Sequence, residues 1–314
     1  MLPGIALGLS AATLFGLSDF LSALVSRKLG SLFTLLGVQV VGIVLLVFYF
    51  LRAGEAIHLQ VDSLPVIFLI GAGLGLLDTL AYFSFYIGLS IGPVAIVSPI
   101  TASYAVVTVL LTVIVGELPT FWQEVGLCCV LGGVILVSLD ASVLPKRAVW
   151  HTFTSVAHWK AVLSEKWQRI AQLKSGSFFA GVAMLGFGLH LFFLSRWTRV
   201  VGPLVAVFFI RLFSALILGV VVALYRREAL PRHLPFKSLA SITLIGVLDT
   251  LGLIAFSAGT MRELTSIVTT LASSYSLIPI FLGVIVLRER VARVQGAGIV
   301  AILLGLGLLA ALHR

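Results

Sequence analysis

Long apolar stretches alternate with short polar segments along the whole chain. They lie at 3–25, 32–52, 65–88, 93–115, 120–140, 177–197, 203–225, 237–259, 265–287 and 292–312. Each stretch has about 20 residues, the length that an α-helix needs to cross the hydrocarbon core of a bilayer. The pattern therefore predicts an all-α integral membrane protein with ten transmembrane helices.

An internal repeat divides these helices into two sets of five. The segment at 75–80 reads GLLDTL, and the segment at 246–251 reads GVLDTL, so their aspartates are 249 − 78 = 171 positions apart. A serine–tyrosine pair at 103–104 recurs at 274–275 with the same spacing. Matches in one order and at one spacing indicate that the two halves of the chain share one fold.

The repeat predicts the domain organisation. We expect a first five-helix repeat at 1–140, a basic linker at 141–176 and a second five-helix repeat at 177–314. Because five is odd, the repeats must have opposite orientations across the membrane. Inverted repeats are typical of secondary transporters, whose substrate site lies near the bilayer midplane. The linker is interpreted either as solvated chain or as an amphipathic helix on the membrane surface.

Composition narrows the function classes. Hydrophobic residues make up 60% of the chain and charged residues 11%, whereas soluble domains have about 25% charged residues. The net charge of +9 is spread over segment ends, as expected for residues that flank membrane helices, so nucleic-acid binding is not predicted. The only cysteines, Cys128 and Cys129, are adjacent and form no zinc framework. We expect no metal, no cofactor and no catalytic residue.

Particular stretches resemble a known family. In the second repeat, 271–279 reads LASSYSLIP and 287–290 reads LRER. The first repeat has Pro99 and Glu117, and it departs from the second at Thr108, where the second has a proline. These stretches resemble the EamA-type transporters of the drug/metabolite transporter (DMT) superfamily. The resemblance implies a secondary transporter that exports small metabolites such as amino acids by alternating access, coupled to protons or to exchange.

Ionisable side chains lie inside several predicted membrane helices. Each costs about 2.5–3.5 kcal/mol at a helix centre on insertion scales, so a functional role is a reasonable hypothesis for each. Serines and tyrosines of the repeated pair are expected close by. The candidate substrate-binding or proton-binding residues are Asp19, Asp78, His190, Arg211, Asp249, Tyr104, Tyr275, Ser103 and Ser274.

Each candidate also has a structural interpretation. Asp78 and Asp249, which are repeat equivalents, either bind a proton or cation, or hydrogen-bond neighbouring helices. Arg211 either clamps an anionic group of a substrate or pairs with one of the aspartates. Asp19 either faces a ligand or packs among small residues, and His190 either relays protons or is a neutral buried side chain. A cavity that combined Arg211 with carboxylates would suit a zwitterion such as an amino acid.

Four further residues are interpreted as parts of the structural motif. Pro99 and Pro279 interrupt the hydrogen-bond ladder of the fourth and ninth helices, and the freed carbonyls either line a cavity or allow a bend. Glu117 and Glu289 end these helices, where a carboxylate can accept hydrogen bonds from the free N–H groups of the next helix.

Orientation and alternative functions stay open. Lys and Arg are more frequent after odd-numbered helices, which would place both termini outside, whereas the family resemblance implies cytoplasmic termini. The alternative function is a non-transport membrane role in lipid handling, as a receptor or as an intramembrane enzyme. We expect a small-molecule substrate and the lipid bilayer as partners, and a multi-pass location in the cell membrane. A monomer is expected to suffice, because one chain contains both repeats.

Overall fold

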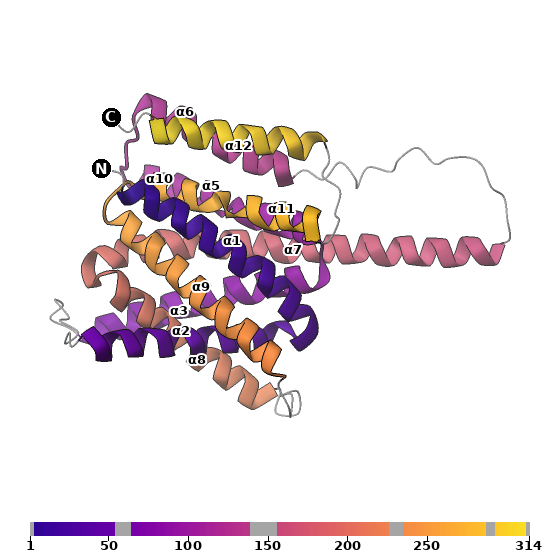
Figure 1. Ribbon diagram of the computed structural model, residues 1–314, viewed down its shortest axis with the longest axis horizontal. Coiled ribbons are helices and arrows are strands. Elements are labelled where there is room, and N and C mark those ends of the chain that lie inside the picture. Colours follow the sequence, from indigo (N-terminus) through magenta and orange to yellow (C-terminus); the bar gives the residue numbers. More distant parts are fainter. Residues whose placement is uncertain (1–2, 54–63, 139–155, 226–234, 287–292, 312–314) are drawn as a thin grey trace.

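The computed structural model of the chain describes residues 3–53, 64–138, 156–225, 235–286 and 293–311 (Figure 1). Most of these residues are helical, and no strand occurs among them. The first half contains α1 (Pro3–Leu29), α2 (Ser31–Ala53), α3 (Leu64–Ile91), α4 (Val94–Ala102), α5 (Tyr104–Ile114) and α6 (Phe121–Ser138). The second half contains α7 (Val156–Val201), α8 (Pro203–Tyr225), α9 (Phe236–Thr260), α10 (Thr265–Ser273), the 3₁₀ turn η3 (Ser274–Ser276), α11 (Leu277–Val286) and α12 (Arg293–Ala311).

The membrane-spanning helices agree with most of the sequence prediction. Eight segments within the described residues are long and apolar enough to cross a membrane, and two of them are the joined pairs α4–α5 and α10–α11. The apolar parts of α6 and α12 are shorter, at Phe121–Leu136 and Gly296–Leu306. The chain is therefore a multi-pass all-α membrane protein, with eight of the ten predicted spans confirmed by length and composition.

The two halves are interleaved. Helix α1 packs along α9, α3 packs along α7, and α2 packs against α8, so each of these helices packs on a helix of the other half (Figure 1). The turns that lead into α2 and α8 are also equivalent, with Gly30 at φ 85° and Gly202 at φ 82°. These left-handed conformations favour glycine, because a Cβ atom would meet the backbone.

Helices α6 and α12 form a separate pair along one side of the bundle (Figure 1). Small residues let their backbones approach closely. A Cβ atom added to Gly133 would lie 2.7 Å from the carbonyl oxygen of Gly298, and one added to Gly305 would lie 2.8 Å from that of Gly126. Only glycine fits at these contacts without moving a helix.

The fourth and ninth spans are both broken near the middle. Helix α4 contains Pro99 and ends at Ala102, and α5 begins at Tyr104. The ninth span breaks at η3, and Pro279 follows as the third residue of α11. Proline has no N–H, so Pro279 leaves the carbonyl of Tyr275 without its helical donor. The breaks therefore lie at equivalent positions of the two repeats.

The second part of the predicted linker belongs to α7. Residues 156–176 continue the sixth span as one straight helix, which projects well beyond the bundle (Figure 1). This segment is therefore neither irregular chain nor a separate short helix. The first part of the linker, up to residue 155, lies outside the described residues.

Candidate functional site

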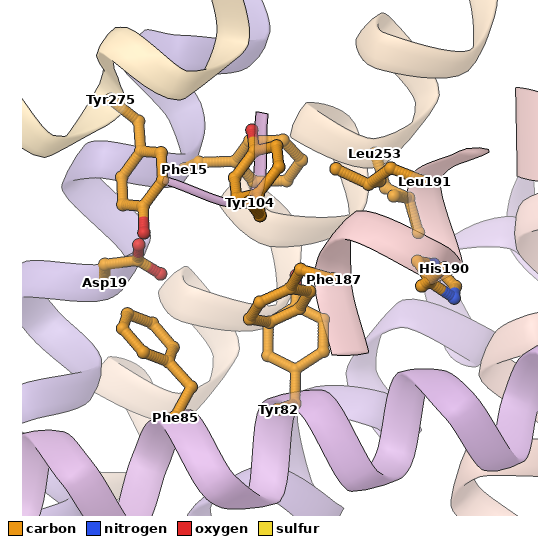
Figure 2. Close-up of a pocket in the computed structure, with 10 residues that line it drawn as sticks. All are labelled: Phe15, Asp19, Tyr82, Phe85, Tyr104, Phe187, His190, Leu191, Leu253 and Tyr275. Atoms are coloured by element: carbon orange, nitrogen blue, oxygen red, sulfur yellow. The ribbon is translucent and has the colours of Figure 1, made fainter. Parts of the chain in front are cut away.

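A small cavity lies inside the bundle, where α1, α3, α5, α7, α9 and η3 meet (Figure 2). Its volume of about 30 Å³ holds roughly two water molecules. Each half contributes five lining residues, so the cavity lies between the repeats. The lining residues are Phe15, Asp19, Tyr82, Phe85, Tyr104, Phe187, His190, Leu191, Leu253 and Tyr275.

Asp19 is the one aspartate that lines this cavity. It is only 5% exposed, and within the described residues its carboxylate accepts no hydrogen bond and joins no ion pair. Figure 2 shows the ring of Tyr275 directed toward this carboxylate. A buried carboxylate without a protein partner is costly, so its environment favours a proton or a bound cation.

The repeated tyrosines meet at the cavity. The rings of Tyr104 and Tyr275 stack with their centroids 6.3 Å apart and their planes 12° apart. The Tyr275 hydroxyl donates to the carbonyl of Ser98 at 3.3 Å, whereas the buried Tyr104 hydroxyl has no partner in the described part of the chain. The Tyr104 hydroxyl is therefore free to contact a solute.

The repeated serines have a different role from the tyrosines. The hydroxyl of Ser103 donates to the carbonyl of Pro99 at 3.2 Å, and that of Ser274 donates to the carbonyl of Leu271 at 2.6 Å. Both serines therefore satisfy carbonyls of their own helices beside the breaks, and neither lines the cavity.

The other ionisable candidates form a buried network next to the cavity. The side-chain amide of Gln39 donates to Asp78 at 2.9 Å and accepts from Arg211 at 2.7 Å. Arg211 Nη2 lies 2.5 Å from Asp249 Oδ2, and the hydroxyl of Tyr82 donates to Asp249 Oδ1 at 2.7 Å. The network therefore joins α2 to α3, α8 to α9 and the two halves to each other.

The network decides between the two interpretations of Arg211. Its guanidinium is fully buried, is already paired with Asp249 and does not line the cavity. In this conformation the guanidinium is therefore held by Asp249 and does not face a solute in the cavity. The prediction of a zwitterionic amino acid as substrate assumed that Arg211 would bind the negative group of the solute. In this conformation Arg211 is not placed to do so.

His190 lies between the network and the cavity. Its Nε2 atom is 3.6 Å from Asp78 Oδ1, which is longer than a hydrogen bond, and its ring also lines the cavity. Tyr82 has the same double position, since its ring lines the cavity while its hydroxyl bonds Asp249. These two residues are the direct connections from the cavity to the charged network.

Comparison with known proteins agrees with this architecture. The family model described as the EamA-like transporter family matches residues 2–139 and 174–311, which are the two halves. The chain belongs to the EamA-like transporter family. This confirms the resemblance seen in the sequence, and membership of a transporter family fits the prediction that the protein is not an enzyme.

A solved crystal structure has the same fold as this EamA-like chain. It is similar over 99% of this chain and 98% of its own, with a TM-score of 0.66 and 17% sequence identity. A structural similarity at this sequence identity shows the fold but does not indicate the substrate. Among curated proteins, none matches the sequence.

In this EamA-like chain, Glu117 stabilises a helix of the opposite repeat. Its carboxylate accepts from the backbone N–H groups of Thr265 at 3.3 Å and Ser266 at 3.0 Å, at the start of α10. From the sequence we expected this carboxylate to accept from the next helix, α6; that prediction is wrong in its partner, because the two hydrogen bonds come from α10. Arg199 lies 3.6 Å from the same carboxylate. Glu289 lies outside the described residues.

Most of the aromatic lining was not among the sequence candidates. Phe15 and Phe187 are repeat equivalents, 187 − 15 = 172 positions apart, and both face the cavity. Their match within the repeat was the only signal that could have found them. Tyr82 and Phe85 carried no such signal, because the 21 phenylalanines and 6 tyrosines of the chain are spread over many helix faces.

Proposed function

We propose that this EamA-like chain is a secondary transporter that moves a small solute by alternating access, with the Asp19 cavity as its solute site. The observation that carries the proposal is a buried carboxylate that has no partner among the described residues, in a cavity lined equally by the two repeats. Sites between inverted repeats are where secondary transporters bind their substrates. We include α6 and α12 as the fifth and tenth spans.

The broken spans support a movement around this cavity. Tyr104 and Tyr275 both line the cavity. Tyr104 is the first residue of α5, directly after the break in the fourth span, and Tyr275 lies in η3, which is itself the break in the ninth span. A change of backbone angle at either break would move a tyrosine and open one side of the cavity. The small volume in the present conformation corresponds to a closed site, and a larger solute requires opening.

Coupling is proposed at Asp19. A carboxylate that has no protein partner can exchange a proton for a solute, because either one removes the cost of the buried charge. Transport in one direction would then be driven by proton movement in the other. Export from the cell, the direction that the family resemblance implies, completes the proposal.

Accessibility of the cavity from both membrane faces tests the proposal. Leu191 is buried in the cavity lining, so a Leu191→Cys variant reports on access to the site. Cys128 is exposed and Cys129 is half-buried, so both are first replaced by alanine. The purified variant is reconstituted in liposomes and treated with a membrane-impermeant thiol reagent from one side or the other.

We expect Leu191→Cys to react from both faces, with reaction slowed by a transported solute. The matched control is Leu216→Cys, which is 55% exposed on the outer surface of α8 and should stay unreactive inside the lipid. A cysteine at position 191 that reacts from one face only, or from neither, would contradict alternating access at this cavity. Flux of labelled metabolites into the same liposomes, compared with empty liposomes, then identifies the solute.

A further inference from the structure

The two sides of the cavity differ in polarity although they are repeat equivalents. Asp19 corresponds to Leu191 (191 − 19 = 172), and Tyr82 corresponds to Leu253 (253 − 82 = 171). All four line the cavity, and Figure 2 shows Asp19 on one side and the two leucines on the other. The cavity therefore has an acidic side at Asp19 and an opposite side where two leucines lie beside His190.

The charges around the cavity do not balance. The guanidinium of Arg211 is held by Asp249 and Gln39, and His190 Nε2 lies 3.6 Å from Asp78 Oδ1, which is too far for a hydrogen bond. Asp19 has no cationic partner among the described residues. A negative charge in a region of low dielectric attracts a cation strongly, and an anionic group placed there would be repelled.

Aromatic rings surround this charge. Six of the ten lining residues are aromatic: Phe15, Tyr82, Phe85, Tyr104, Phe187 and Tyr275. The negative face of an aromatic ring attracts an ammonium group within about 6 Å, and cages of rings recognise quaternary ammonium ions. Metal ions such as Mg²⁺ or Ca²⁺ prefer a shell of oxygen ligands, which a single carboxylate among rings does not supply.

We propose that the solute of this cavity is an organic monocation, with an ammonium head beside Asp19 and an apolar body against Leu191 and Leu253. This inference rests on the proposed transport function and gives its substrate class. A zwitterion or an anion is disfavoured, because Arg211 is paired with Asp249 outside the lining. His190, the one basic side chain among the ten lining residues, already has the carboxylate of Asp78 beside it at 3.6 Å.

Matched probes test the charge requirement. Methylammonium, tetramethylammonium and choline are titrated into the detergent-purified protein by isothermal calorimetry, each beside its neutral carbon isostere. For choline, the isostere carries a tert-butyl group in place of the trimethylammonium group. We expect at least one ammonium ion to bind, and its isostere to bind with a Kd that is higher by roughly tenfold or more.

Variants separate binding chemistry from folding. Asp19→Asn keeps the shape of the side chain. It should weaken the binding of the ammonium ion by roughly tenfold or more and leave the affinity for the isostere unchanged. Phe187→Leu removes a ring and should lower the affinity ratio of ion to isostere, whereas a purely structural defect would lower both affinities together. The matched control is Phe178→Leu, which removes a ring from α7 at a position that is 66% exposed and outside the cavity lining, and it should retain the ratio. Gel filtration and thermal melting establish that each variant is folded.

Three results would overturn the cation assignment: an isostere that binds as well as its ammonium ion, an Asp19→Asn protein with unchanged ammonium affinity, or no binding by any of the ions. Failure of the transport proposal is seen separately, in one-sided labelling of Leu191→Cys. If labelling occurs from both faces but a neutral or zwitterionic solute slows it, the transporter stands and the cation assignment falls.

Discussion

Arg211 and Asp249 form an ion pair in the interior of the bundle, with Nη2 2.5 Å from Oδ2 and both side chains shielded from solvent. The pair connects α8 to α9 within the second repeat. The equivalent positions of the first repeat, Gln39 and Asp78, make a hydrogen bond of 2.9 Å between α2 and α3. One hydrogen bond from Arg211 to Gln39 then joins the two repeats.

Removing one partner of this pair should destabilise the protein strongly. Asp249→Asn leaves the buried guanidinium without a counter-charge, and loss of one partner of a buried ion pair costs about 3–5 kcal/mol. Unfolding of the detergent-purified protein, followed by circular dichroism, measures this effect. As the control, the double variant Arg211→Gln/Asp249→Asn replaces the ion pair by neutral amides and should recover most of the loss. A single variant as stable as the parent would contradict the assignment.

The same substitution, aspartate to asparagine, should have the opposite effect on stability at position 19. Asp19 is buried but has no partner among the described residues, so Asp19→Asn removes an unfavourable buried charge and breaks no ion pair. We expect a melting temperature equal to or higher than that of the parent, together with lost solute coupling. Such an exchange of stability for function is common at binding sites. A large decrease in melting temperature, like that expected for Asp249→Asn, would show that Asp19 is structural.

The spans and the repeat were predictable because both depend on local patterns. Apolar length predicts a membrane helix, and the repeated GLLDTL and GVLDTL segments identify the equivalent helices. The partner of Arg211 was not predictable among three aspartates, because the pattern gives depth in the membrane but not the rotation of each helix. The tertiary structure directs Asp249 to Arg211 and leaves Asp19 in the cavity.

Two other features depended on contacts between distant segments. Glu117 is near α6 in sequence, yet the interleaving of the repeats brings it to α10, 148 residues away. Aromatic residues are equally suited to lipid and to a cavity, so Phe85 carried no signal in a chain that is 60% hydrophobic. In both cases the information lies in how the two halves pack together, which the local pattern does not contain.

Loss of the carboxylate of Glu117 should destabilise α10. Glu117→Ala removes the acceptor for the first N–H groups of α10 and the negative charge at the positive end of the helix dipole. We expect a loss of about 1–3 kcal/mol in the free energy of unfolding, since buried donors are left unsatisfied. The control is Glu124→Ala, an exposed glutamate in the first turn of α6, with an effect within about 0.5 kcal/mol. Equal effects of the two substitutions would remove the special role of Glu117.

Two adjacent glycines of α6 should respond differently to the same substitution. A Cβ atom at Gly133 would lie 2.7 Å from the backbone oxygen of Gly298, whereas one at Gly132 meets no atom within 4 Å. Gly133→Ala must therefore push α6 away from α12, and we expect overpacking to cost about 1–3 kcal/mol. Gly132→Ala should be neutral or slightly stabilising, because alanine favours helix formation.

Thermal melting of the two alanine variants in one detergent compares them directly. No further variant is needed, because the two substitutions are at neighbouring positions of one helix and each serves as the control for the other. If Gly133→Ala melts at the parent temperature while Gly132→Ala melts lower, α6 faces α12 with a different side. That result would place the close backbone contact between α6 and α12 elsewhere, and with it the packing that holds the two repeats together at this edge.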